Sequence, residues 1–206
     1  MNTYIIDVGT SHNAPRGIEL RNQTGLPVIF IEPDTYALNQ VPAIDGDIKL
    51  NCAIAPYDGE IEFNFYQQGT HSVLKTNVEE ISKKYIDGYS WKIARKEDWI
   101  PKMTVNVPCK KLSTIIKELN IDEIPYLKID TQGYDLEVIK SLEEYTNIVK
   151  YIECEVQTTD FEVYINQSKK EDIIEYLSSR GFELIITESQ TFNQEENLIF
   201  ERIQII

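Results

Sequence analysis

The sequence predicts an α/β fold built on a mostly parallel, doubly wound sheet that ends in an antiparallel strand. Short apolar runs rich in β-branched residues recur with amphipathic stretches between them, as in parallel strands covered on both faces. The last two runs follow each other without a helical pattern, which predicts a terminal antiparallel pair. We find no repeat and no linker, so we expect a single domain over residues 1–206.

Seven strands and three clear helices account for this prediction. The strand-like runs, in order, are TYIIDV, LPVIFIEP, IKLNCAIAP, IPYLKID, VKYIECEV, FELIITES and ENLIFERIQII. In KKLSTIIKELN, the spacing of Leu112, Ile115, Ile116 and Leu119 places four apolar side chains on one helical face. YDLEVIKSL predicts a second helix and KKEDIIEYLSSRGF a third, which Gly181 is well placed to end.

One segment interrupts the alternation of strands and helices. Residues 58–103 begin as an alternating, strand-like stretch, turn polar, and contain both tryptophans, Trp91 and Trp99. Insertions at the carboxyl edge of such sheets often carry function, so this one is a candidate substrate lid. A solvated excursion that its tryptophans anchor to the core is an equal alternative.

Composition excludes several classes of partner. A net charge of −14 argues against an extended nucleic-acid surface, which needs clustered lysine and arginine. The chain contains no apolar run of membrane-spanning length, and its N-terminus lacks the basic region of a secretory signal. Cys52, Cys109 and Cys154 lie far apart without metal-ligand spacing, which is typical of reduced core cysteines. We therefore expect a cytoplasmic protein.

Polar and acidic residues gather where the expected strands end, the edge at which open α/β sheets bind ligands. They are Asp7 and Gly9 after the first strand, Glu32 at the second, Asn51 and Ala53 at the third, Asp130 at the fourth, and Glu155 at the fifth. This is more acidic character than a core requires, and such carboxylates need a partner or a ligand. The strand ends are therefore the predicted binding site.

The loop after the first strand lacks the dinucleotide pattern G-x-G-x-x-G. Gly9 allows a close backbone approach to a ligand, while Thr10, Ser11 and His12 offer polar contacts in place of a glycine-lined pyrophosphate cradle. Glu32, about twenty residues beyond the glycine, suits hydrogen bonds to ribose hydroxyls. The pattern indicates a nucleoside without a diphosphate, and S-adenosylmethionine fits that description.

The sequence resembles FkbM-type S-adenosylmethionine-dependent methyltransferases over nearly its whole length from Tyr4. The resemblance is carried by IIDVG, VIFIEPD, NCAIAPYDGEIEF, VPCKKLSTIIKE, YLKIDTQGYDLEVIKSL and YIECEVQ, in that order. It implies a Rossmann-like class I methyltransferase domain that generally methylates hydroxyl groups, often of sugars or secondary metabolites.

The resemblance also implies roles for individual residues. Asp7 and Gly9 would line the loop on the methionine side of the cofactor. Glu32 would bind the ribose, and the stretch Asn51–Ala53 would border the adenine. Asp130 would face the methionine amino group or the acceptor.

This chain departs from the family pattern in two places. The family's first loop usually reads D-x-G-A-N-x-G, whereas here it reads D-V-G-T-S-H-N, without the second glycine. The helices that normally precede the first strand are missing, since that strand begins at about residue 3. Both departures predict a more open cofactor pocket. Gly133 with Asp135 matches the family's glycine-then-acid pair, although the acid there is usually glutamate.

Candidate general bases for methyl transfer are few. Asp130 is the first choice and His71 the second, and Glu155 is a third because its strand should neighbour that of Asp130. His12 in the first loop also has a suitable side chain. Asp130 and Glu155 together would suit a divalent cation, which nothing else in the sequence indicates. His71 as a plain loop residue, and Glu155 as a cap of the sheet edge, remain open.

The sequence therefore predicts an S-adenosylmethionine-dependent methyltransferase that most simply methylates a hydroxyl of a sugar, glycan or small metabolite. A non-catalytic methyltransferase-like module that binds a protein or glycan is the alternative. An NAD-dependent oxidoreductase is disfavoured by the missing glycines and the short chain.

Overall fold

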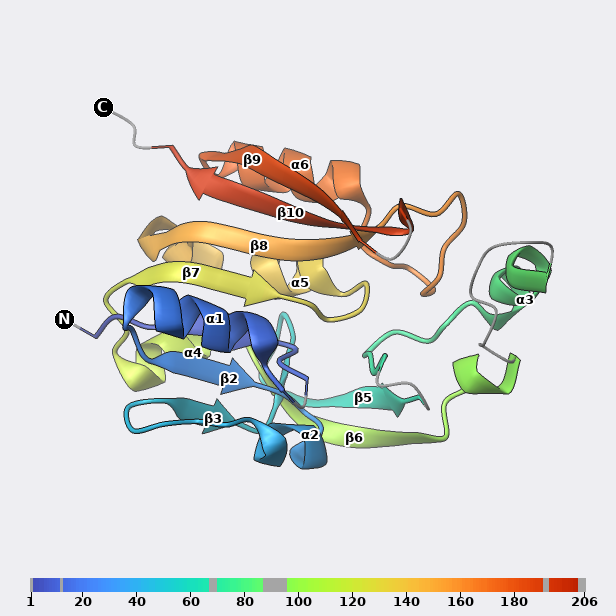
Figure 1. Cartoon of the computed structure of the whole chain (residues 1–206), viewed down its shortest axis with the longest axis horizontal. Helices are drawn as coiled ribbons and strands as arrows, with labels where there is room; N and C mark the ends of the chain where they lie inside the picture. Colours follow the sequence, from blue (N-terminus) through green and yellow to red (C-terminus); the bar gives the residue numbers. More distant parts are fainter. Residues whose placement is uncertain (1, 12, 67–69, 87–95, 191–192, 204–206) are drawn as a thin grey trace.

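The computed structural model describes residues 2–11, 13–66, 70–86, 96–190 and 193–203. Its centre is a seven-stranded sheet of order β3-β2-β1-β7-β8-β10-β9 (Figure 1). The strands are β1 Ile5–Val8, β2 Val28–Ile31, β3 Ile48–Leu50, β7 Ile124–Ile129, β8 Val149–Gln157, β9 Phe182–Gln190 and β10 Glu195–Arg202. The first five in spatial order are parallel, and β10 runs antiparallel to both β8 and β9. The predicted Rossmann-like fold class is confirmed.

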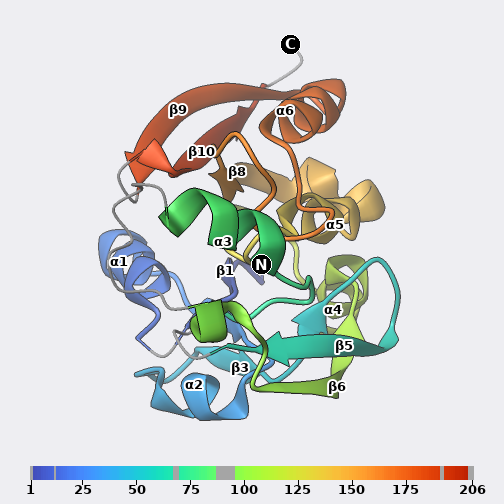
Figure 2. The same cartoon turned by 90° about the vertical axis from the view of Figure 1, so that its right-hand side faces the viewer.

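Helices cover both faces of this sheet. They are α1 Pro15–Thr24, α2 Thr35–Gln40, α4 Leu112–Leu119, α5 Asp135–Lys140 and α6 Lys170–Ser179, with 3₁₀ turns at Glu143–Ile148 and, in the insertion, at Lys96–Trp99. Figure 2 shows α1 on one face and α4, α5 and α6 on the other. Among the described residues, no helix is both long and apolar enough to span a membrane.

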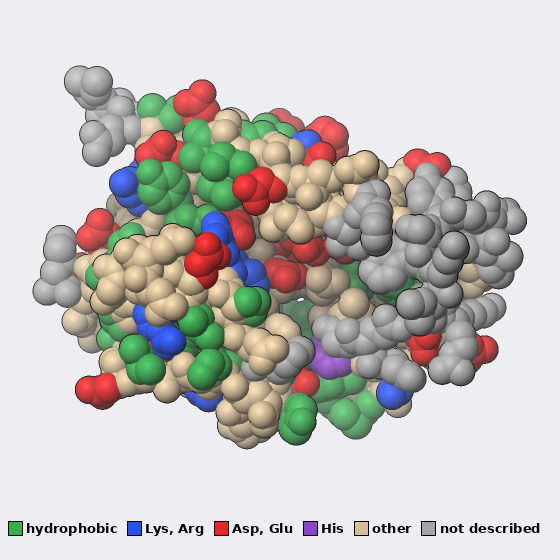
Figure 3. All heavy atoms as spheres, viewed as in Figure 1, with side chains coloured by type: hydrophobic (Ala, Val, Ile, Leu, Met, Phe, Trp, Pro, Cys, Tyr) green, Lys and Arg blue, Asp and Glu red, His purple; other side chains and the backbone are tan. Residues whose placement is uncertain are grey.

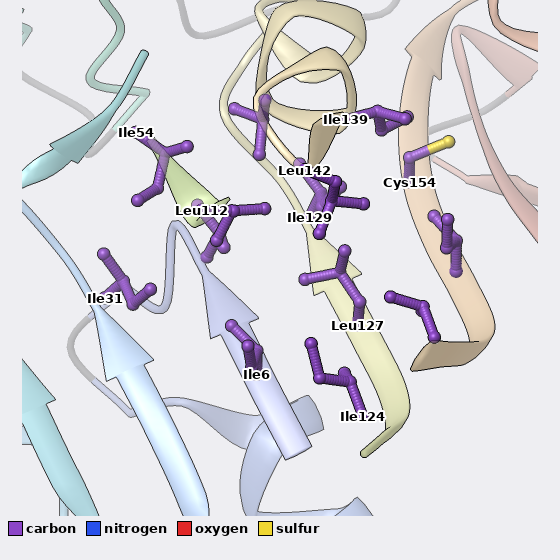
Figure 4. Close-up of a cluster of buried hydrophobic side chains, with 14 of the residues drawn as sticks. Ile6, Ile31, Ile54, Leu112, Ile124, Leu127, Ile129, Ile139, Leu142 and Cys154 are labelled. Carbon is purple, nitrogen blue, oxygen red and sulfur yellow. The ribbon is translucent and has the colours of Figure 1, made fainter. Parts of the chain in front are cut away.

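The main core lies between the sheet and the helices α4 to α6. Ile6, Leu127, Ile129 and Cys154 point from adjacent strands toward Leu112 and its neighbours (Figure 4). Burying each such aliphatic side chain contributes roughly 1.5–3 kcal/mol. Because strand side chains alternate, the residues between them face α1 instead, and there a smaller apolar cluster gives way to charged groups. This alternation turns Asp7 and Lys128 toward the α1 face.

A second, three-stranded sheet of order β4-β6-β5 stands beside the first. It consists of β4 Ala53–Ile54, β5 Gly59–Phe65 and β6 Met103–Lys110. Helix α3 Val78–Ile86 comes between β5 and β6 in the chain and lies beyond the ends of these strands (Figure 1). The single strand expected for IKLNCAIAP is therefore wrong, because the chain leaves the main sheet after Leu50. The alternating stretch after Asp58 does form an antiparallel strand, paired with β6.

Candidate functional site

A cavity of about 370 Å³ opens at the carboxyl ends of β1, β2 and β7, between the two sheets. Of the sequence-predicted site residues, it is lined by Gly9, Ser11, Glu32, Ala53, His71 and Asp130. These residues come from segments far apart in the chain. The fold therefore brings most of the predicted site into one concave surface.

Gly9 is required where the loops after β1 and β7 touch. Its φ is +71°, and a Cβ at this position would lie 1.8 Å from the carbonyl oxygen of Asp130. The backbone N–H of Gly9 donates to Ile31 O at 3.0 Å. No side chain fits there, so the glycine lets two cavity-lining loops meet.

Glu32 is a buried carboxylate at the end of β2, only 7% exposed. Its Oε1 accepts the N–H of Asp34 at 2.9 Å and its Oε2 accepts the N–H of Ser11 at 3.3 Å. Burial raises the pKa of Glu32 to about 7, although these two N–H donors act in the opposite direction. Each carboxylate oxygen can accept more than one hydrogen bond, so Glu32 retains capacity for ligand hydroxyls.

Beside Glu32 the cavity wall is apolar. Cys52, Ala53 and Ile54 form one side and Phe63 of β5 contributes an aromatic ring. Burial raises the pKa of the Cys52 thiol to about 11, so it stays protonated at neutral pH. Small and flat side chains of this kind suit a planar heterocycle.

Asn51 lies at the same turn but does not line the cavity. Its Nδ2 donates to the carbonyls of Glu32 and Pro33, each at 2.9 Å, and its Oδ1 accepts the hydroxyl of Thr35. These bonds hold the turn between β2 and α2. Its neighbours Cys52 and Ala53 line the cavity instead.

Lys128, on β7, lies between the carboxylates at the strand ends, and it was not predicted as a site residue from the sequence. Its ammonium lies 3.3 Å from Asp7 Oδ1 and 3.7 Å from Asp130 Oδ2, and it donates to Gly9 O at 3.0 Å. Burial alone would lower the pKa of Lys128, but the two carboxylates outweigh it and the pKa is raised. The sequence feature that could have indicated this residue is the presence of a lysine inside the otherwise apolar run IPYLKI.

The carboxylates of Asp130 and Glu155 accept hydrogen bonds from the same side-chain amide, that of Gln132. Gln132 Nε2 donates to Asp130 Oδ1 at 2.8 Å and to Glu155 Oε1 at 3.2 Å. The hydroxyl of Tyr164 donates to Gln132 Oε1 at 2.7 Å, which fixes the orientation of the amide. Burial and the charges of Asp130, Glu195 and Asp135 raise the pKa of Glu155 well above its ordinary value. The expected neighbourhood of Asp130 and Glu155 is confirmed by the pairing of β7 with β8.

A second cavity, of about 400 Å³, adjoins the first. Asp7, Thr10 and Glu155 line this cavity and not the first, while Ser11 and Asp130 line both. Asp7 Oδ2 accepts the hydroxyl of Thr10 at 3.0 Å. Two cavities thus meet at the end of β7.

The family model of the methyltransferase FkbM domain matches residues 7–184. The chain belongs to the FkbM methyltransferase family. A comparison with curated proteins gives no match.

Solved structures similar to this FkbM domain share little sequence with it. A Streptococcus agalactiae protein of the NADB-Rossmann superfamily is 13% identical, with 100% of this chain and 64% of that one covered and a TM-score of 0.42. Streptococcus pneumoniae Sp1610, a putative tRNA (m1A22) methyltransferase, is 13% identical, with 100% and 66% covered and a TM-score of 0.43. The N-terminal domain of human METTL16 in complex with SAH is 11% identical, with 99% and 63% covered and a TM-score of 0.45. The FkbM domain spans less than two thirds of each of these chains.

His71 of the FkbM domain is arranged as a hydrogen-bond donor. Its Nδ1 accepts the backbone N–H of Tyr66 at 3.0 Å, and its Nε2 lies 3.6 Å from Asp34 Oδ2. Burial lowers the pKa of His71, against the opposing effect of Asp34. The neutral ring therefore carries its proton on Nε2 and has no free lone pair for a substrate proton.

The remaining predicted residues are His12 and the two tryptophans. His12 and Trp91 lie outside the described residues. Trp99 is buried with Ile81, Val163 and Tyr164. Within the described part of the chain, no three His, Cys, Asp or Glu side chains are grouped to hold a metal ion.

Proposed function

We propose that this FkbM domain is an S-adenosylmethionine-dependent O-methyltransferase whose donor occupies the first cavity. The observation that carries the proposal is Glu32, a buried carboxylate with spare acceptor capacity beside an apolar wall and a glycine loop. When bound, S-adenosylmethionine supplies a methyl group already activated on a sulfonium. The protein has to bind the donor, align the acceptor and accept its proton.

The residues of the first cavity fit the parts of this donor in order. Glu32 would accept the ribose hydroxyls, and Ala53 with Phe63 would flank the adenine. Gly9 and Asp130 would border the amino-acid end, where the adjacent loops touch. A cavity of about 370 Å³ lies within the usual range for small-molecule sites.

Asp130 is our choice for the general base. The acceptor oxygen forms a bond to the methyl carbon while the carbon–sulfur bond breaks and leaves its electron pair on sulfur. The hydroxyl proton passes to the Asp130 carboxylate, which Gln132 holds from one side. Glu155 is less suited, because its raised pKa favours the protonated form. His71 would donate a hydrogen bond from Nε2.

We further propose that the insertion 58–103 forms a substrate lid over the first cavity. Phe63, Tyr66, His71 and Val73 already form one wall of the first cavity. The acceptor would be a sugar, glycan or small metabolite, because a net charge of −14 opposes a nucleic-acid backbone. The free, buried cysteines agree with a reducing, cytoplasmic setting.

Calorimetric titration with S-adenosylmethionine, S-adenosylhomocysteine and NAD tests the proposal. We expect saturable micromolar binding of the first two and none of NAD. Glu32→Ala should weaken binding by at least tenfold, since hydrogen bonds to a charged group contribute about 1.5–3 kcal/mol each. Glu62→Ala, an exposed carboxylate on β5, is the matched control and should bind like wild type.

The other outcomes have defined meanings. Binding of NAD would favour an oxidoreductase. No binding of any of the three would favour the non-catalytic methyltransferase-like module.

A further inference from the structure

Part of the insertion is docked on the loop that joins β8 to α6. Residues 75–77 and 163–165 form a short antiparallel pair, in which one backbone N–H group from each segment donates to a carbonyl of the other at 2.8 Å. We call this pair the docking strap. Figure 2 shows α3, which follows the strap in the chain, beside the loop to α6. Ile81 of α3 and Trp99 pack with Tyr164 in one buried cluster, so the docked insertion covers Tyr164.

Tyr164 links this docked segment to the first cavity. It is only 1% exposed, and a Cβ added at Gly133 would lie 3.3 Å from its ring, so the ring packs on the backbone beside Gln132. Its hydroxyl donates to Gln132 Oε1 at 2.7 Å, and the side chain of Thr70, in the insertion, also interacts with this hydroxyl. Ser72 Oγ, another group of the insertion, lies 2.9 Å from Gln132 O. The insertion therefore contacts the backbone of Gln132 directly and its side chain through Tyr164.

Gln132 in turn holds the proposed base. Its Nε2 donates to Asp130 Oδ1 at 2.8 Å and to Glu155 Oε1 at 3.2 Å, so the amide serves two carboxyl groups at once. Its backbone φ is +54°, a left-handed conformation that is unfavourable for a residue with a side chain. Such a conformation persists where surrounding contacts hold it, and Ser72 with Tyr164 supplies those contacts.

The amide of Gln132 competes with Lys128 for the Asp130 carboxylate. Asp130 Oδ2 lies 3.7 Å from the Lys128 ammonium, while Oδ1 is bound by the amide. Asp135 and Glu155 are further acidic groups that interact with Asp130, and Figure 3 shows acidic side chains gathered in the hollow beside α1. A carboxylate released by the amide would move toward the ammonium, because opposite charges attract strongly where water is largely excluded. It would then turn away from the first cavity, which Lys128 does not line.

We propose that Tyr164 is a positioning residue through which the docked insertion keeps the proposed base in place. This inference rests on the proposed function. With the strap docked, the Tyr164 hydroxyl orients the Gln132 amide, and the amide holds Asp130 where the two cavities meet. With the strap released, the amide loses its orientation and Asp130 turns to Lys128. Closing of the lid and alignment of the base are then one event.

Tyr164→Phe tests the contact, because it removes one hydroxyl and keeps the buried ring. NMR spectra of the full chain with S-adenosylhomocysteine bound follow hydrogen exchange of the Gln132 side-chain amide and the carbon-13 signal of the Asp130 carboxyl. The amide should exchange about fivefold faster or more, the factor that a typical net hydrogen bond represents. The Asp130 signal should shift, whereas a tyrosine that only packs would leave it in place. S-adenosylhomocysteine affinity should stay within about twofold, because Tyr164 does not line the first cavity.

Trp99→Ala tests the coupling through the insertion. Trp99 lines neither cavity, but its ring packs in the cluster beside the strap, so its loss should release the strap. We expect the Gln132 amide to exchange faster by about the same factor as in Tyr164→Phe, and the double variant to show no further increase. Tyr151→Phe is the matched control, because the Tyr151 hydroxyl donates to Glu201 Oε1 at the same distance of 2.7 Å, outside both cavities. It should leave both signals unchanged.

An unchanged Asp130 signal in Tyr164→Phe, or an unchanged Gln132 amide in Trp99→Ala, would each overturn the inference. Failure of the proposed function would look different. Wild type would then not bind S-adenosylhomocysteine, whereas the same spectra of the free protein would still report the coupling.

Discussion

The charge on Glu32 should make the stability of the protein depend on pH. Burial raises its pKa from 4.5 to about 7 in the folded protein. A carboxyl group with a raised folded-state pKa contributes stability that is complete below pH 4.5 and is lost as the pH rises through 7. At 1.36 kcal/mol per pKa unit the full effect is about 3 kcal/mol, most of which falls between pH 5 and 8.

Glu32→Gln isolates this contribution, because glutamine does not titrate. Asp135, whose pKa burial also raises to about 7, adds to the pH dependence of both proteins and cancels in the comparison. We therefore expect the loss of unfolding free energy from pH 5 to 8 to be smaller in the variant by about 2 to 3 kcal/mol. Urea unfolding at pH 5, 6, 7 and 8, followed by circular dichroism, measures the difference.

The matched control is Glu183→Gln, an exposed carboxylate on β9, which should retain the wild-type pH dependence. An identical slope for wild type and Glu32→Gln would refute the reasoning, since it would mean that Glu32 is not held in a costly environment. The same burial has a functional counterpart. In the proposed function, ribose hydroxyls donate to the ionised carboxylate, so cofactor affinity should rise with pH through about 7 in wild type.

Three further substitutions test the architecture of the site. Gly9→Ala should abolish S-adenosylhomocysteine binding and lower the free energy of unfolding in urea by several kcal/mol, because its Cβ would meet Asp130 O. Gly25→Ala is the control: it has nearly the same φ but lies in open space, so it should cost only about 1–2 kcal/mol. Lys128→Met leaves two carboxylates without their shared cation and should cost about 3 kcal/mol at pH 7, measured in the same way. Ala53→Leu should fill the apolar end of the first cavity, so calorimetry should show a loss of cofactor binding of tenfold or more while the unfolding midpoint changes little.

Much of the fold could be predicted because its signals are local. The apolar faces of α4 and the β-branched strands carry their period within ten residues, and the structure preserves it. The run IKLNCAIAP was wrongly predicted as one strand, because a nearly continuous apolar run does not show where the chain passes from one sheet to another. Ala53 and Ile54 leave the main sheet to pair with Cys109 and Lys110. The paired residues are more than fifty positions apart in the sequence, so no local pattern predicts the pairing.

Strand β6 of the second sheet was not predicted from the sequence, for a different reason. Pro108 lies inside β6, and proline within an apolar run argues against a central strand. It is tolerated because β4 reaches only Cys109 and Lys110, so the side of Pro108 that faces β4 has no partner to satisfy. The short length of β4 is thus what allows a proline in β6, and composition alone does not show it.

The candidate site divides in the same way. Gly9, Glu32 and Asp130 could be found because each ends a strand, and parallel strand ends meet at one edge. Gln132 and Tyr164 could not, since their roles come from contacts across 23 to 32 residues of sequence. Lys128 was visible as a charged residue in an apolar strand, but its contact with Asp7 depends on the register of β7 with β1. Residues that hold the site in place were therefore harder to predict than those at its surface.

The loop after β1 contains a strained residue whose relief gives a last test. Ser11 has a φ of +55°, a left-handed conformation that costs a non-glycine residue roughly 1 kcal/mol. Its backbone N–H donates to Glu32, so the conformation itself serves the proposed ribose site. Ser11→Gly keeps that N–H and removes the strain. We expect it to raise the free energy of unfolding by about 1 kcal/mol and to leave S-adenosylhomocysteine affinity within twofold. A less stable variant would show that the hydroxyl of Ser11, rather than its backbone, holds this loop in place.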